Sequence, residues 1–442
     1  MMRRRLFFTL LCLAVAPGAQ ALGLLDAYQL AQRNDPAWLA AEPAREAGGA
    51  QRQIGRAALL PTLSWGYTTS RNQSEVSSQG NPSQARDYRS QAATLSLQQP
   101  LLDFEALARY RQGNAQATMA ELQWQADRQA LLARVVRLYS NALLAAQRSH
   151  LSRERKHALG ERLALNQRLW DGGEGTHTDV LETQARLNLA LAEQIEALDA
   201  QDAAERALQG ILGQPVALQR LHALVDDFQP APLLPAGFDA WQQLALQHNR
   251  QLAARQQGLA VAEQEVQRQR AGHLPKLGLY ASSRQSRSES ETTYQQAIDT
   301  HSVGLQLTVP LFAGGGVSAA TRQASSRLAQ ARHELDGQTL ETLDALRRHY
   351  NASRNGAARV QAYRLAADSA AAQVQATRNS LLGGERINLD VLDAEQQLFR
   401  ARLQLREAQH ASLLASVDLK AAAGILDEAD LHEAAVHFRR GT

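Results

Sequence analysis

The chain contains two stretches of nearly the same sequence at a fixed distance from each other. The first reads LWDGGE at residues 169–174 and TDVL at 178–181; the second reads LLGGE at 381–385 and LDVL at 389–392. Gly172 corresponds to Gly383 and Asp179 to Asp390, in both cases 211 residues further along. Each stretch is predicted to be a turn between long helical segments, so the chain consists of two copies of one structural unit.

The similarity extends over most of the chain. Residues 60–63 (LPTL) resemble residues 274–277 (LPKL), and each of these motifs precedes a segment of strand-like alternation. Residues 226–237 contain several prolines, which is typical of a linker. We therefore expect a first repeat at 22–225, a linker at 226–237, a second repeat at 238–424 and a C-terminal tail at 425–442.

The N-terminus has the features of a secretory signal peptide. Three arginines at positions 3–5 precede an apolar run at 6–16, and Ala19-Gln20-Ala21 has the small-x-small pattern of a cleavage site. We expect residues 1–21 to be removed, and with them Cys12, the single cysteine of the chain. The remainder contains no apolar run of about 18 residues, so it predicts no transmembrane helix.

Four segments alternate between apolar and polar residues, which indicates strands with one apolar face. These strands are expected at about 62–73, 89–99, 276–287 and 301–309, with exposed polar loops at 74–86 and 286–298. The candidates for lipid-facing side chains are Trp65, Tyr67, Leu305 and Leu307. Ordinary packing in a soluble four-stranded sheet under the helices is the alternative interpretation.

The predicted strands are about 10 residues long, which suffices for a tilted strand to cross a bilayer. Four strands cannot close a transmembrane barrel, for which about eight is the usual minimum, and an open edge is not tolerated in lipid. If the strands span a membrane, several copies of the chain must share one barrel. The fold class predicted is a mixed α/β membrane protein that is mostly long helices.

Two predicted helical segments, 103–170 and 317–382, are each roughly 100 Å long at about 1.5 Å per residue. Four further segments are about half that length and are expected at 24–58, 176–213, 238–271 and 388–424, the first with bends at Pro36 and Pro43. Two adjacent heptad seams run through residues 131–146. They indicate either a helix with neighbours on both sides, as in a ring, or one wide apolar face in an ordinary bundle.

Charge and composition argue against several other classes of protein. The formal net charge is +3 with mixed signs throughout, so nucleic acid is not expected as a partner. His177-Thr178-Asp179 lacks a nucleophile or metal-ligand spacing, and the remaining histidines are scattered. We expect no enzymatic activity, no cofactor and no metal site.

The duplicated strand-strand-helix pattern, the two LPxL strand starts and the turns ending in TDV and LDVLD resemble the TolC family of outer-membrane export ducts. The resemblance implies three copies that share a β-barrel of about twelve strands and a periplasmic α-helical barrel. It also implies outer-membrane lipid, an inner-membrane ABC transporter, a membrane-fusion adaptor and a substrate in transit as partners.

Within the family, the chain resembles the branch that serves type I secretion, which includes ducts for alkaline-protease-type exoproteins. A drug or metal efflux duct is the alternative, although efflux ducts are often lipoproteins and Cys12 does not fit a lipid anchor. A periplasmic coiled-coil adaptor or structural protein is a third hypothesis. It would share the long helices but would not need the paired amphipathic strands.

The resemblance also implies a gate at the two turns. The family's pore-facing aspartates match Asp390 and Asp393, and its lock between the turns matches Arg386 with Asp179 beside Thr178. Leu381 stands where the family prototype has a tyrosine, which leaves the full network open. The alternatives are acids that favour a helix N-terminus and N-caps at Thr178 and Asn388. The turn glycines Gly172, Gly173, Gly383 and Gly384 most simply end helices.

Overall fold

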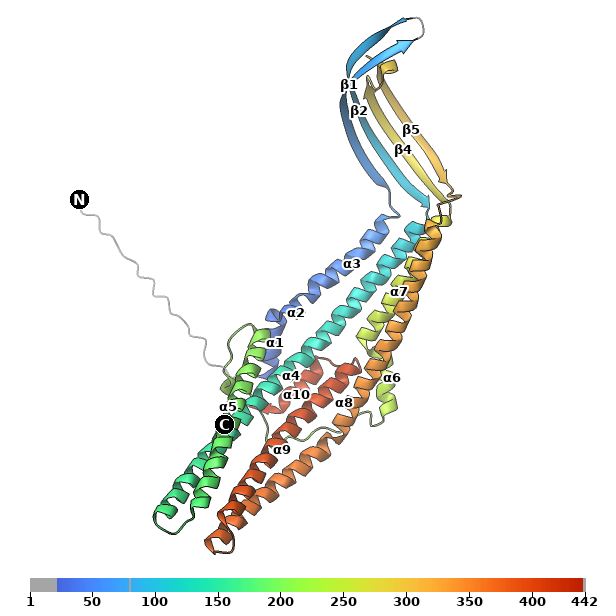
Figure 1. Cartoon of the computed structure of the whole chain (residues 1–442). Coiled ribbons are helices and arrows are strands. Elements are labelled where there is room, and N and C mark those ends of the chain that lie inside the picture. Colours follow the sequence, from blue (N-terminus) through green and yellow to red (C-terminus); the bar gives the residue numbers. More distant parts are fainter. Residues whose placement is uncertain (1–21, 79–80, 440–442) are drawn as a thin grey trace, which may run out of the picture. The chain divides into compact units, whose positions relative to one another are not determined.

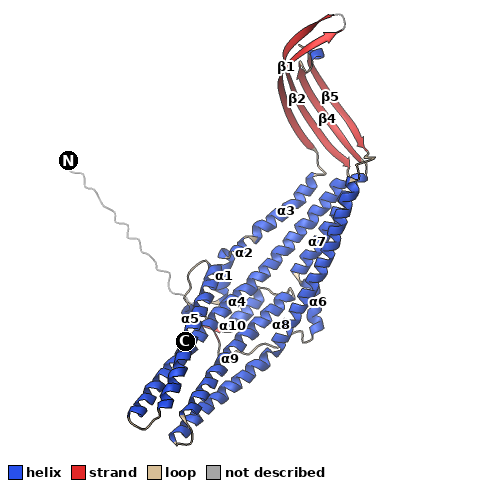
Figure 2. Ribbon diagram, viewed as in Figure 1, coloured by secondary structure: helices blue, strands red, loops and turns tan. Residues whose placement is uncertain are grey.

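The computed structural model describes residues 22–78 and 81–439 (Figures 1 and 2). The predicted signal peptide lies outside the described residues. The α-helices are α1 (Leu24–Asn34), α2 (Pro36–Leu39), α3 (Ala41–Ala57), α4 (Phe104–Asp171), α5 (His177–Leu212), α6 (Phe238–His248), α7 (Arg250–Arg270), α8 (Gly316–Leu382), α9 (Asn388–Ala422) and α10 (Glu428–Val436). The strands are β1 (Thr62–Ser78), β2 (Asn81–Leu102), β3 (Ala223–Leu224), β4 (Lys276–Arg287), β5 (Ala297–Thr308) and β6 (Phe438–Arg439).

The predicted helix at 24–58 is divided into α1, α2 and α3. Asp35 interrupts it because its side chain caps α2 by accepting a hydrogen bond from the Ala37 amide (2.9 Å), and Pro36 follows without an N–H. Pro43 produces no break, because it lies in the first turn of α3, where a missing N–H costs little. In the second half, Asn249 interrupts the helix predicted at 238–271 in the same way, capping α7 through the Leu252 amide (3.0 Å).

Four strands form one antiparallel sheet in the order β1-β2-β4-β5 (Figure 1). β4 has the predicted bounds, whereas β5 begins at Ala297, not near residue 301. β1 and β2 contain 17 and 22 residues, well beyond the expected length of about 10.

The loop predicted at 74–86 is therefore wrong for most of its length, since β1 extends to Ser78 and β2 begins at Asn81, and the two strands pair there as a ribbon. Its polar sequence suggested a loop, but backbone pairing between two strands needs no apolar side chain. Next to this segment, polar cross-strand pairs join the same two strands. Ser70 Oγ lies 2.6 Å from Ser90 Oγ, and Arg71 Nε donates to Asp87 Oδ1 at 3.0 Å.

The chain divides into two compact units, each built from segments of both halves. One contains residues 22–40, 127–248 and 343–439, and the other contains residues 41–126 and 249–342. The two long helices, α4 (68 residues) and α8 (67 residues), each contribute to both units. The sheet belongs entirely to the second unit.

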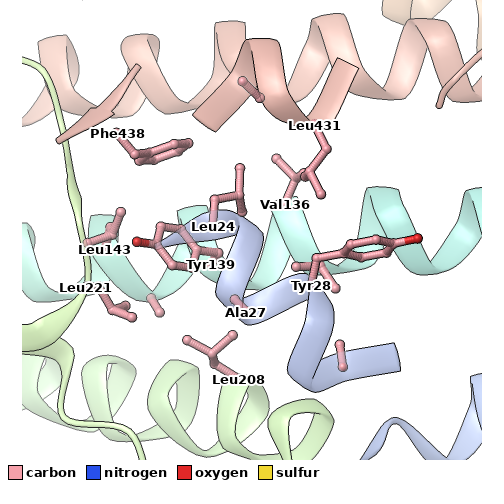
Figure 3. Packing of buried hydrophobic residues seen from close by; sticks show 14 of the residues in the cluster. Leu24, Ala27, Tyr28, Val136, Tyr139, Leu143, Leu208, Leu221, Leu431 and Phe438 are labelled. Atoms are coloured by element: carbon pink, nitrogen blue, oxygen red, sulfur yellow. The ribbon is translucent and has the colours of Figure 1, made fainter. Parts of the chain in front are cut away.

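The first unit has a large apolar core where α1, α4, α5 and α10 meet (Figure 3). Most residues of the two seams predicted on α4 are buried in this core or packed against it, so both seams contact other helices of the same chain. Tyr139 of α4 packs edge-on against Phe438, with ring centroids 5.2 Å apart. The segment 425–439 is thus not a simple tail, because α10 packs in the core and β6 pairs with β3.

None of the described helices combines the length and the apolar character that crossing a membrane requires.

Candidate functional site

The two duplicated turns close the helical hairpins α4–α5 and α8–α9 in the first unit (Figure 2). At the first turn, Gly173 has a positive φ of 78°, and the Glu174 amide donates to the Leu169 carbonyl (2.9 Å). At the second, Gly384 has a φ of 76°, and the Glu385 amide donates to the Ser380 carbonyl (2.9 Å). This left-handed conformation favours glycine, so Gly173 and Gly384 end their helices.

The preceding glycines still belong to the helical hydrogen-bond pattern. The Gly172 amide donates to the Arg168 carbonyl (3.0 Å), and the Gly383 amide donates to the Asn379 carbonyl (3.1 Å). The two turns therefore have the same local geometry, and differences between them must come from the side chains that follow.

The start of α5 is capped by Thr176. Its Oγ1 accepts a hydrogen bond from the Asp179 amide (3.1 Å) and donates to Asp179 Oδ2 (2.6 Å). The N-cap predicted at Thr178 is wrong, since Thr178 lies inside the first turn of α5 and is exposed. Asp179 thus serves the helix N-terminus, where its charge is favourable.

The start of α9 differs, because Ile387 occupies the N-cap position. The Asp390 carboxylate accepts a hydrogen bond from the Ile387 amide (3.3 Å). The N-cap predicted at Asn388 is therefore wrong. Asn388 is the first helical residue and is buried, and its Nδ2 lies 3.5 Å from Thr183 Oγ1 of α5.

Arg386 forms its ion pair with Asp390, four residues further on, at an N–O distance of 3.8 Å. Within the described chain, the structure does not pair Arg386 with Asp179, the link that the resemblance implied. Both partners of that link interact locally, each with a residue of its own turn.

Asp393 makes a direct charged contact between the two hairpins. Arg186 Nη2 of α5 lies 2.6 Å from Asp393 Oδ1 of α9. The side chain of Arg186 is 24% exposed and that of Asp393 is 63% exposed. Arg186 did not emerge from the sequence, because nothing in local spacing relates two residues that are 207 positions apart.

Further polar contacts join the hairpins, with few apolar ones. Glu395 of α9 pairs with Arg162 of α4 (3.4 Å) and, within its own hairpin, with Arg378 of α8 (2.6 Å). Arg155 Nη2 of α4 donates to Gln396 Oε1 of α9, and Asn388 Nδ2 of α9 lies 3.5 Å from Thr183 Oγ1 of α5. The local apolar cluster consists of Leu159, Ala190 and Leu392, with Leu187 packed against it. Ion pairs and hydrogen bonds therefore carry much of the contact between these hairpins.

The sheet has one strongly apolar face, because directly paired residues point to the same side. In the register, Trp65 pairs with Leu95, and Leu305 pairs with Leu279. This face carries Leu63, Trp65, Tyr67, Leu95, Leu97, Leu277, Leu279, Val303, Leu305 and Leu307. All four side chains predicted to face lipid, Trp65, Tyr67, Leu305 and Leu307, are more than half exposed. The opposite face is polar or small, with Ser64, Ser96 and Gln306 among its residues.

Among the described residues, no group of three or more histidine, cysteine, aspartate or glutamate side chains could hold a metal ion. The two candidate functional features are the polar junction of the two hairpins and the apolar face of the sheet.

The fold matches that of outer-membrane channels. The solved structure of the CmeC outer membrane channel of Campylobacter jejuni superposes with a TM-score of 0.79 at 17% sequence identity, covering 94% of this chain and 89% of that one. The model of the outer membrane efflux protein family matches residues 27–214 and 241–425. The chain belongs to this family, which confirms the resemblance inferred from the sequence.

Two relatives are considerably more similar in sequence. The alkaline protease secretion protein AprF of Pseudomonas aeruginosa is 48% identical over 426 residues, covering 96% of this chain and 89% of that protein. The proteases secretion protein PrtF of Dickeya chrysanthemi is 42% identical over 443 residues, covering 99% of this chain and 96% of that protein. The protein is thus an outer-membrane export channel, with its long helices in the periplasm.

Proposed function

We propose that this protein is the outer-membrane duct of a type I secretion system and that it exports a protease. Two relatives named for protease secretion share 48% and 42% of their aligned residues with it over nearly its whole length. In this function the duct is passive. An inner-membrane ABC transporter supplies the energy, and a membrane-fusion adaptor joins the transporter to the duct.

The open sheet with one apolar face is the observation that supports an assembly of three copies. β1 and β5 form its two edges, and an unpaired edge exposes backbone N–H and C=O groups that cost several kcal/mol each in lipid. Pairing β5 of one copy with β1 of the next satisfies these groups. Three copies supply about twelve strands, above the minimum of about eight for a transmembrane barrel.

In this assembly the apolar face turns toward lipid and the polar face lines the channel. Trp65 and Tyr67 then lie on the lipid side, where aromatic residues form interfacial girdles. The apolar residues of β5 on this face are Val303, Leu305 and Leu307, and those of β4 include Leu277 and Leu279. In this assembly both edge strands are hydrogen-bonded, the apolar face contacts lipid and the polar face contacts the water of the channel.

The hairpin turns form the periplasmic gate in this proposal. Asp390 and Asp393 are three residues apart at the start of α9, so they share one helix face. Three copies arrange these aspartates around one opening, where a ring of carboxylates attracts cations. Arg386, Thr178 and Asp179 lie at the same turns and complete the gate region.

Disulfide cross-linking tests the assembly. Single cysteines along β1 are combined with single cysteines along β5 in the same chain, which otherwise contains only Cys12 of the predicted signal peptide. Disulfides form only between Cα atoms within about 7 Å, so matched pairs yield linked dimers and trimers in the outer-membrane fraction. Recovery as a soluble periplasmic monomer would contradict the duct and favour an adaptor or structural protein.

A secretion assay tests the cargo. The chain is expressed in a host that lacks its own protease duct but keeps the cognate transporter, adaptor and protease. Protease in the medium is the expected result. If the chain instead restores only drug or metal resistance to an efflux-deficient host, the efflux alternative holds.

A further inference from the structure

Arg186 is the charged residue that brings the two hairpins together at a gate aspartate. It projects from α5 and contacts Asp393 of α9 at 2.6 Å, whereas Arg386 lies 3.8 Å from Asp390 within its own helix start. Each of the two aspartates therefore has a guanidinium of its own within one chain. The two contacts differ in kind, because only the Arg186 contact joins α5 to α9.

The pairing changes the field that Asp393 projects. A carboxylate in direct contact with a guanidinium forms a dipole, whose potential falls off with distance much faster than that of a single charge. Screening by salt reduces the remainder further, with a Debye length of about 8 Å at physiological ionic strength. A passing cation therefore experiences much less attraction from Asp393 than the sequence alone suggests.

The surroundings keep Arg186 directed at Asp393. Arg155 and Arg400 lie in the same groove between α5 and α9, and their positive charges disfavour movement of Arg186 toward them. Glu193 already forms an ion pair with Arg155. Glu182, one turn before Arg186 on α5, is a further acidic residue that lines this groove.

We propose that Arg186 is a selectivity-determining residue that neutralises Asp393, so that the gate attracts cations mainly through Asp390. This inference rests on the proposed channel function, since it concerns the charge around the channel opening. The partner recognised at the gate is a multivalent cation, and Arg186 controls how strongly it binds. In three copies, removing Arg186 exposes three additional carboxylates at the opening.

Planar-bilayer recordings of the full chain test this, with La³⁺ as the blocking cation and a KCl gradient for ion selectivity. Arg186→Gln is expected to tighten La³⁺ block by about tenfold and to make the channel more cation-selective. Arg186→Lys, which keeps the charge, is expected to behave nearly as the unmodified protein. Arg168→Gln is the matched control, because Arg168 lies near the same turn and donates to the Ala164 carbonyl of its own helix (3.1 Å).

The decisive comparison uses Asp393 in the same recordings. Asp393→Asn alone leaves Arg186 uncompensated and is expected to weaken La³⁺ block, whereas Arg186→Gln with Asp393→Asn removes both charges and should restore the unmodified value. This comparison works even if Arg186→Gln alone does not assemble, because the double variant should bind La³⁺ more tightly than Asp393→Asn.

Two results would overturn the inference. Arg186→Gln could change conductance without changing La³⁺ affinity, or the double variant could match Asp393→Asn. Either outcome would make Arg186 a structural link only. Failure of the unmodified protein to conduct at all would instead remove the proposed channel, and the inference with it.

Discussion

The hydroxyl of Tyr139 donates a hydrogen bond to the backbone carbonyl of Leu22 at 2.9 Å. The same oxygen accepts a hydrogen bond from the His222 amide at 2.8 Å. One buried hydroxyl thus joins the middle of α4 to two segments that are far away in the sequence. The rest of the ring packs in the apolar core of the first unit (Figure 3).

Tyr139→Phe should destabilise this core. The substitution keeps the apolar ring but removes the hydroxyl's hydrogen bonds to Leu22 and His222, which then keep only the longer bond from the His222 amide to the Leu22 carbonyl (3.3 Å), at a cost of about 1 kcal/mol. Thermal unfolding followed by circular dichroism in detergent measures the effect. Tyr67→Phe is the control, since the Tyr67 side chain is exposed on the sheet and should leave the melting temperature unchanged.

Stability should fall in acid because of His410. Its Nδ1 lies 2.7 Å from Ser140 Oγ, and burial, aided by the charge of Arg406, lowers the pKa of His410 to about 4. The unfolded chain takes up a proton below pH 6.5, whereas the folded chain does not until about pH 4. The contribution is therefore complete above pH 6.5 and is lost as the pH falls to 4, on the order of 3 kcal/mol per chain.

His410→Gln should flatten this dependence. Unfolding by denaturant at several pH values between 7 and 4 measures the slope, and the variant should lose less stability over this range than the unmodified protein. His333→Gln is the control, because its ring is exposed. An equal slope in the His410 variant would show that another group causes the acid sensitivity.

Thr176→Ala should loosen the first turn of α5. It removes the cap on the Asp179 amide, which is worth about 1 kcal/mol. Hydrogen exchange at residues 177–181 should accelerate several-fold. Thr178→Ala, the same change two residues away at an exposed position, should leave the exchange nearly unchanged. The opposite order of effects would restore Thr178 as the cap.

Leu305→Arg should impair membrane assembly, whereas Gln306→Arg should not. The two residues are neighbours on β5 but lie on opposite faces, and an arginine facing lipid costs up to about 2–4 kcal/mol, depending on its depth in the bilayer. The yield of heat-resistant oligomers in the outer-membrane fraction measures this. Equal yields would mean that the apolar face does not meet lipid.

Asp390→Asn should weaken the block of the channel by multivalent cations. Its carboxylate lies 3.8 Å from Arg386, so its negative charge is less neutralised than that of Asp393, the other aspartate proposed for the gate. We expect a several-fold loss of La³⁺ affinity in planar bilayers. Asp171→Asn, at the C-terminal end of α4, is the control for a general change of surface charge. An unchanged affinity would exclude Asp390 from the cation site.

Much of the fold could be predicted because it depends on short-range periodicity. The bounds of α5, α8 and α9 differ from the predicted ones by at most two residues, and β4 has the predicted bounds. The strand residues 74–78 and 81–86 were missed, since their polar side chains show no apolar alternation. The N-caps of α5 and α9 were missed for a related reason. Several residues near a turn could act as the N-cap, and only the backbone geometry selects one of them.

The sequence alone determined the duplication, the amphipathic strands and the glycine turns. These properties follow from residue types at fixed local spacings. The tertiary structure alone decided the partners of the charged residues: Arg186 for Asp393, Asp390 for Arg386 and Thr176 for Asp179. Arg186 and Asp393 are 207 positions apart, so their contact exists only after the hairpins have packed together. The pairs Arg386–Asp390 and Thr176–Asp179 are local, and the backbone geometry of each turn selects them among several near neighbours.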